Sequence, residues 1–140
     1  MSSFTGDLTI TQLKNWRIWR LEQDFIYEVG DKGSGKKIVV PKGFVTDGAS
    51  IPQIFWVFLP TWGSYSRAAV VHDYLCILWN SGTPHVLTPV RKDVDAILYE
   101  AMMVSEVNII IAYFIWLGAR VGSLVKALRR KLGYTNVTNF

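Results

Sequence analysis

The order of hydrophobic and polar residues changes along the chain, and its first part is typical of β-structure. Over residues 16–21 (WRIWRL) large hydrophobic and charged residues alternate, as in a half-buried strand. Residues 25–29 and 38–40 are aromatic or β-branched runs, separated by the glycine-rich loop 30–35. We therefore predict a small antiparallel sheet or hairpin within about residues 15–45.

Residues 46–63 follow neither the strand nor the helix period. The segment begins with turn-rich sequence that includes Gly48, Ser50 and Pro52, and it continues into an aromatic run before Pro60. An irregular backbone this apolar must satisfy its own hydrogen bonds while it packs over a core. We expect an irregular loop segment, with these three residues shaping its turns.

The remainder of the chain has helical spacing. Three helices are predicted, over about residues 64–79, 88–104 and 108–132, followed by a tail at 133–140. The first two helices are joined by a short loop, so they should form an antiparallel hairpin. The whole pattern predicts an α+β fold in a single domain over residues 1–140, with the β part first and the helical part last.

Composition supports one folded domain. The chain has 140 residues, of which 50% are hydrophobic and 14% aromatic, so it can bury a core and disorder is excluded. Cys76 is the single cysteine, which rules out an internal disulfide and a cysteine zinc cluster and is compatible with a reducing cytoplasm.

Targeting and membrane signals are weak in the sequence. The first residues, MSSFTGD, lack the basic and apolar blocks of a signal peptide. The most apolar run, residues 107–117, is followed by Gly118, Ala119 and Arg120, well short of the roughly 20 apolar residues that a span requires. The expectation is a buried or interfacial helix and no transmembrane span.

The net charge of +4 comes largely from the C-terminal part, where Lys126 and residues 129–131 are basic. A basic helix end can bind the phosphates of a lipid or a nucleic acid, but it also complements the helix dipole. So short a cluster does not favour nucleic-acid binding over a lipid partner.

His72 and Asp95 are the strongest candidates for chemistry. His72 lies eight residues before Asn80, where the turn begins, and Asp95 lies seven after Thr88, so both are roughly 11 Å from the turn and face one another. An aspartate that orients a histidine makes it a general base. The alternative is a structural pair that ties the two helices together.

Two further acidic residues and one arginine complete the candidate set. Asp73 points about 100° away from His72 and could approach Asp47 in the irregular segment, where two carboxylates and loop carbonyls would suit Ca²⁺. Asp47 is followed by glycine, so a turn explains it equally well. Arg67 lies one turn before His72 and could bind an anion or a neighbouring helix carboxylate.

Two long motifs resemble a known family. VPKGFVTDGASIP (residues 40–52) and GSYSRAAVVHDYL (residues 63–75), together with the stretch 91–102, are similar to the signature of the domain-of-unknown-function family DUF1353. The resemblance covers most of residues 38–128. It implies a gene product of a tailed phage or prophage, in the virion or the host cytoplasm, without an established activity.

A more distant resemblance concerns the site alone. His-Asp in a helix, followed by an antiparallel helix with Asp95, is similar to the core of the prokaryotic phospholipases A2, whose upstream Asp-Gly-small-Ser segment has a counterpart at residues 47–50. The resemblance implies that His72 deprotonates water, that Asp95 orients it, and that Asp73 and Asp47 bind Ca²⁺. Cys76 stands where the family has a tyrosine, and the family disulfides are missing.

Two functions follow from these residues. The first is a hydrolase, with His72 and Asp95 at work on a lipid or cell-envelope ester and a membrane surface as its partner. The second is a non-catalytic virion or tail component, with other phage proteins as partners and a structural histidine–aspartate pair.

Overall fold

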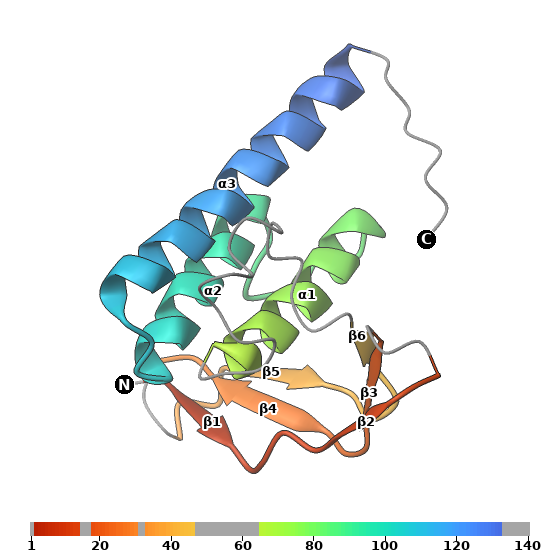
Figure 1. Ribbon diagram of the computed structural model, residues 1–140, viewed down its shortest axis with the longest axis vertical. Helices are drawn as coiled ribbons and strands as arrows, with labels where there is room; N and C mark the ends of the chain where they lie inside the picture. The colour runs from red at the N-terminus through yellow and green to blue at the C-terminus, as the bar shows by residue number, and fades with distance from the viewer. Residues whose placement is uncertain (1, 15–17, 31–32, 47–64, 133–140) are drawn as a thin grey trace.

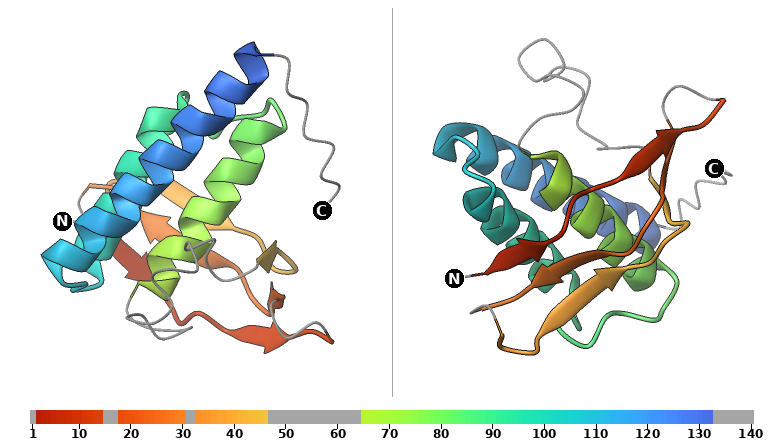
Figure 2. Two further views of the ribbon diagram at one scale, coloured as in Figure 1. Left: turned by 45° about the horizontal axis from the view of Figure 1, so that its top comes forward. Right: turned by 90° about the horizontal axis from the view of Figure 1, so that it is seen from below.

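The computed structural model describes residues 2–14, 18–30, 33–46 and 65–132. Six short strands come first and three helices follow, so the predicted α+β class is confirmed. The strands are β1 (Ser3–Thr5), β2 (Ile10–Gln12), β3 (Trp19–Leu21), β4 (Phe25–Glu28), β5 (Lys37–Val40) and β6 (Val45–Thr46). The helices are α1 (Ser66–Asn80), α2 (Arg91–Val104) and α3 (Ile109–Lys131), and they lie on one side of the strands (Figures 1 and 2).

The strands form two antiparallel sheets of three strands each, in the orders β1-β4-β5 and β2-β3-β6. In β5 every second residue is buried, so Ile38 and Val40 face the helices while Val39 is exposed. Phe25 and Tyr27 of β4 pair with residues of β5 and are buried with them. This strand pair is therefore the floor on which the helices pack.

The helices run up, down and up again, with α2 antiparallel to both of its neighbours (Figure 2). α1 and α2 form the predicted hairpin, and their inward stripes merge into one hydrophobic core with the sheet. The Tyr27 hydroxyl donates to Glu100 of α2 (2.8 Å), which ties β4 to that helix. The members from α1 and α2 with less than 5% of their surface exposed are Ala68, Val70, Val71, Leu75, Val94, Leu98, Ala101 and Met102.

Several boundaries differ from the sequence prediction. β1 and β2 lie before residue 15, where the β part was expected to begin, because each is too short to show an alternating pattern. Thr46, assigned to the irregular segment, belongs to β6 and pairs with Trp19. The rest of that segment and the tail at 133–140 lie outside the described residues, and the single-domain assignment stays a prediction.

The helix starts also bear on the prediction. α2 begins at Arg91 rather than at Pro89, and the buried Thr88 does not cap it; instead Asp93 accepts a hydrogen bond from the N–H of Val90 (3.3 Å). At α3 the expected residue does cap, since Asn108 Oδ1 accepts from the N–H of Ile110 (2.9 Å). Both helices end within a residue of the predicted position.

The apolar run that was expected to stop at Gly118 continues as one helix through Arg120 to Lys131. Residues Ile109–Leu128 have a mean hydropathy of 1.6, and by length and composition alone such a helix could cross a membrane. The length argument against a span therefore does not hold, because it counted only the apolar run before Gly118, and the helix stays apolar beyond Arg120. The expectation of no transmembrane span stays a prediction.

Candidate functional site

The two residues singled out in the hairpin meet as predicted. His72 Nε2 lies 2.8 Å from Asp95 Oδ1, and the Asp95 side chain is completely buried. His72 retains 16% of its side-chain surface. The facing of α1 and α2 is therefore confirmed, whereas the catalytic role of the pair stays a prediction.

Asp95 binds two arginines in addition to His72. Arg91 Nε, one turn earlier on α2, donates to Oδ1 at 3.3 Å, and Arg120 Nη1 of α3 donates to Oδ2 at 2.9 Å. A buried carboxylate needs such donors to offset the loss of its hydration. Asp95 thus connects all three helices through one side chain.

The pKa values follow from this geometry. Burial opposes the carboxylate charge of Asp95, but the hydrogen bond with His72 and the charges of Arg91 and Arg120 outweigh it and lower the pKa. Burial likewise opposes protonation of His72, but its contacts with Asp95 and Cys76 outweigh that cost and raise the pKa to about 9. The imidazolium form therefore predominates at neutral pH.

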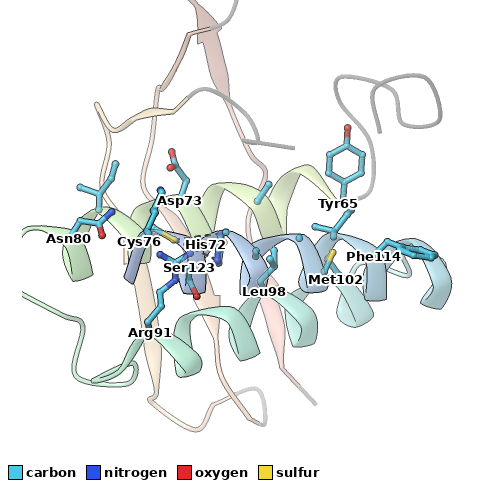
Figure 3. A pocket seen from close by; sticks show the side chains of 17 residues that line it. Tyr65, His72, Asp73, Cys76, Asn80, Arg91, Leu98, Met102, Phe114 and Ser123 are labelled. Carbon is cyan, nitrogen blue, oxygen red and sulfur yellow. Dashed lines mark hydrogen bonds between the residues drawn. The ribbon is translucent and has the colours of Figure 1, made fainter. Parts of the chain in front are cut away.

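An open cavity of about 420 Å³ lies between α1 and α3, with α2 at its base, and His72 is part of its wall (Figure 3). The wall changes in character from one end to the other. Near one end are Asn80, Arg91 and Ser123, and near the other are Tyr65, Met102 and Phe114, with His72 between them. Lys126, one turn after Ser123 on α3, belongs to the first end. Gly118, Ala119 and Gly122 line the α3 side, where the lack of bulky side chains leaves room.

A second cavity of about 240 Å³ adjoins the polar end and shares Arg91 and Lys126 with the first. Lys92 and Arg120 complete its cationic lining, and no acidic residue is among the described residues that line it. Asp95, which two of these cations contact, offsets part of their charge. The excess of positive charge favours an anionic ligand at this end.

The thiol of Cys76 contacts the imidazole ring of His72. Cys76 lies one turn after His72 on α1, its Sγ is 3.7 Å from Nδ1 and 3.5 Å from Nε2, and it lines the larger cavity. With Nε2 bonded to Asp95, Nδ1 is the nitrogen left for a proton from the cavity. A thiol is small beside the tyrosine expected from the phospholipase resemblance, and this leaves space beside the ring.

Of the other predicted site residues that the structure describes, Asp73 lines the larger cavity and Arg67 does not. Asp73 lines the cavity and projects from α1 away from α2 (Figure 3). Arg67 is exposed and is not among the residues that line it, so its anion contact stays a prediction. Asp47, Gly48, Ser50 and Pro52 lie outside the described residues. Within the described ranges no group of three histidine, cysteine or acidic residues could hold a metal ion.

The residues of the site that were not predicted from the sequence include Cys76, Arg91, Arg120 and Lys126. Arg120 carried a usable signal, because an arginine in the middle of an apolar helix needs a buried counter-charge and Asp95 was already placed inside. Cys76 and Arg91 carried a signal too, since each lies one turn from His72 or Asp95 on the same helix. Lys126 could be found only from the arrangement of α3 beside α1, which helical periodicity does not specify.

Comparison with known proteins places the chain in a family. The profile described as "Protein of unknown function (DUF1353)" matches residues 19–119, which include every described residue of the His72–Asp95 network except Arg120. The chain belongs to this family. No solved structure matches the chain.

A similar protein from a bacterium has no assigned activity. The chain is 44% identical over 61 residues to "Uncharacterized protein y4jT" of Sinorhizobium fredii. The match covers 42% of this chain and 17% of the relative. The relative is therefore much longer than this chain, and the two are similar over one segment only.

Proposed function

We propose that this member of the family hydrolyses an ester of an anionic amphiphile, a lipid or a cell-envelope component, with His72 as general base. The observation that carries the proposal is the position of the His72–Asp95 pair, in the wall of a cavity that is cationic at one end and apolar at the other. A histidine with a purely structural role has no need of such a cavity.

The chemistry follows from Nδ1, the ring nitrogen that Asp95 does not bind. In the neutral form, Nε2–H donates to Asp95 and the lone pair of Nδ1 accepts a proton from a water molecule in the cavity. The hydroxide oxygen forms a bond with the ester carbonyl carbon, the bond from that carbon to the alkoxy oxygen breaks, and Nδ1–H returns the proton to the leaving alcohol. Asp95 stabilises the imidazolium between these steps.

The lining indicates the substrate class. An anionic head would lie near Arg91, Lys92 and Lys126, and an acyl chain would extend past Leu98 toward Met102 and Phe114. His72 would then stand beside the ester that joins the two parts. Since its pKa is about 9, the base form increases with pH and hydrolysis should be fastest on the alkaline side.

Calcium binding by Asp73 and Asp47 stays a prediction. Asp73 supplies one carboxylate at the cavity, but the described residues around it do not form a metal-binding group, and Asp47 lies outside them. The residues at hand do not establish a fit for Ca²⁺, so the mechanism uses no metal. Asp73→Asn, assayed with and without added calcium, tests that prediction separately.

The test is fatty-acid release from anionic phospholipid vesicles and from soluble acyl esters between pH 7 and 9.5. His72→Ala should lower the rate at least about 100-fold, because general-base catalysis contributes that much or more. His85→Ala, which changes a histidine that does not line the cavity, is the matched control and should keep the wild-type rate. No release by the wild type, or equal rates for His72→Ala, would reject the hydrolase.

Cys76→Ala tests which atom attacks. If water is the nucleophile, this variant keeps hydrolysis within a few-fold of the wild type. Loss of hydrolysis, with an acylated Cys76 trapped in the wild type, would assign the attack to the thiolate and overturn the water step.

One observation favours a second candidate, a non-catalytic phage virion or tail protein. Asp95 connects three helices through His72, Arg91 and Arg120, as a purely structural centre would. Under this alternative His72→Ala lowers the melting temperature of a protein that never shows hydrolysis. The phage origin implied by the sequence resemblance is part of the proposal and would be tested by detection of the chain in purified particles.

A further inference from the structure

α3 presents a large apolar surface that no other described part of the chain covers. Its members, called the outer face, follow one another at intervals of three and four residues, so they share one side of the helix. The outer face comprises Ile110, Phe114, Leu117, Val121, Leu124, Leu128 and Leu132, flanked by Ile109, Tyr113 and Val125, all of them exposed. Isolated exposed hydrophobic residues are ordinary, but a continuous stripe of this length marks a contact surface.

The extent of the outer face matches a lipid interface. α3 has 23 residues, a length of about 34 Å. Only 6% of the most apolar window of Ile109–Leu128 is buried in the protein. Tyr113 and Phe114 give its first part aromatic side chains, which favour the boundary between headgroups and acyl chains.

The charges of α3 are complementary to an anionic membrane. Its sequence contains no acidic residue, and its basic residues are Arg120, Lys126, Arg129, Arg130 and Lys131. Four of these five lie in its last two turns. A second copy of the same helix, packed side by side in parallel, would bring these like charges together, whereas anionic headgroups would neutralise them.

The core-facing side of α3 and the flanking Arg120 are fixed to the protein. Arg120 pairs with the buried Asp95 at 2.9 Å, and Ala112 is completely buried against the core. A helix that crossed the bilayer alone would have to break this pair and leave the buried Asp95 with Arg91 and His72 as its remaining partners. The helix therefore meets lipid with one side only, and the rest of the domain serves as its polar side.

From these observations we propose that the outer face of α3 docks the protein on the surface of an anionic bilayer, with the helix parallel to the membrane plane. The proposal does not depend on hydrolysis at His72. It does place the apolar end of the larger cavity next to lipid, because Phe114 belongs both to that cavity and to the outer face.

The test is co-sedimentation of the full chain with vesicles of phosphatidylglycerol and phosphatidylcholine, compared with phosphatidylcholine alone. The wild type should bind the anionic vesicles more tightly, and added salt should weaken the binding. The double variant Val121→Glu/Leu128→Glu should lose at least about tenfold in affinity, since two charges would enter the apolar layer. Both residues are exposed and outside the cavities, so the fold should be kept.

The matched control carries the same added charge elsewhere. Val45→Glu/Val86→Glu changes two exposed valines, one on β6 and one in the loop before α2, and should bind as the wild type does. Equal loss in both double variants would mean a general charge effect and would overturn the assignment to the outer face, as would no binding by the wild type.

Two other occupants give different results. A dimer in analytical ultracentrifugation that the Val121→Glu/Leu128→Glu variant abolishes, without vesicle binding by the wild type, would assign the outer face to a second copy. Protein that stays with vesicles after alkaline carbonate extraction would indicate a helix that spans the membrane. Release by carbonate together with the loss in the double variant supports surface docking.

Discussion

The Asp95 network holds α3 to the other two helices through Arg120, whereas the outer face of α3 is exposed. Charged groups lie inside and hydrophobic groups outside, which is the reverse of the usual arrangement in a protein that folds in water. Inside, Asp95, Arg91, Arg120 and His72 bring charged groups together with little contact with water. Outside, large hydrophobic side chains are exposed along the whole helix. Neither arrangement helps a domain of this size to fold in water.

The difference shows what each region contributes. Buried ion pairs often stabilise a fold less than hydrophobic residues of similar volume, so a network of this kind is better explained by what it positions, here the ring of His72. An exposed apolar face lowers solubility unless another phase covers it. Each region is therefore better explained by a function than by stability. The network orients His72 for chemistry, and the outer face suits attachment of the protein to another surface.

The largest effect is expected where the interior charge is removed. Asp95→Asn leaves two arginines and a protonated histidine without their carboxylate, and the free energy of unfolding should fall by about 3–5 kcal/mol, as for other broken buried pairs. Urea unfolding followed by circular dichroism measures this. Asp93→Asn, two residues earlier on α2, only weakens a long hydrogen bond from the Val90 N–H and should cost less than about 1 kcal/mol. Similar losses in both variants would contradict a special role for Asp95.

Much of the interior could be predicted from the sequence, because local rules determine it. The short loop between two periodic segments requires an antiparallel hairpin, and equal distances from the turn bring His72 and Asp95 together. The α+β order followed from alternation in the first part and helical spacing in the last. These inferences need no knowledge of how distant elements pack.

The rest depends on the placement of α3, and periodicity does not determine that placement. Arg120 appeared to interrupt an apolar run, whereas it reaches Asp95 and lets the helix continue. The cavity exists because α1 and α3 stand apart over α2, and this separation is invisible in one sequence. The helix itself was predicted to within a residue at its end, but its apolar stretch was taken to stop at Gly118, and this concealed the outer face.

A smaller effect should follow from the titration of His72. Its pKa is raised from 6.5 to about 9, so protonation stabilises the fold fully below about pH 6.5 and the contribution is lost as the pH rises to 9. The groups around the ring are Asp95 and Arg91 of α2, Arg120 of α3 and Cys76 of α1. Urea unfolding at pH 6, 7.5 and 9 should show the wild type losing stability relative to His72→Asn. Parallel profiles for the two proteins would contradict the raised pKa.

The smallest effect on folding is expected on the outer face, and a pair of identical substitutions shows it most directly. Leu128→Ala should change the free energy of unfolding by less than about 0.5 kcal/mol, because the side chain already contacts solvent. Leu98→Ala, at a buried position of α2, should cost about 2–5 kcal/mol. On anionic vesicles the order should reverse, with Leu128→Ala the variant that weakens binding. A large folding cost for Leu128→Ala would mean that the outer face is covered within the protein itself, and the contrast between the two sides of α3 would then fail.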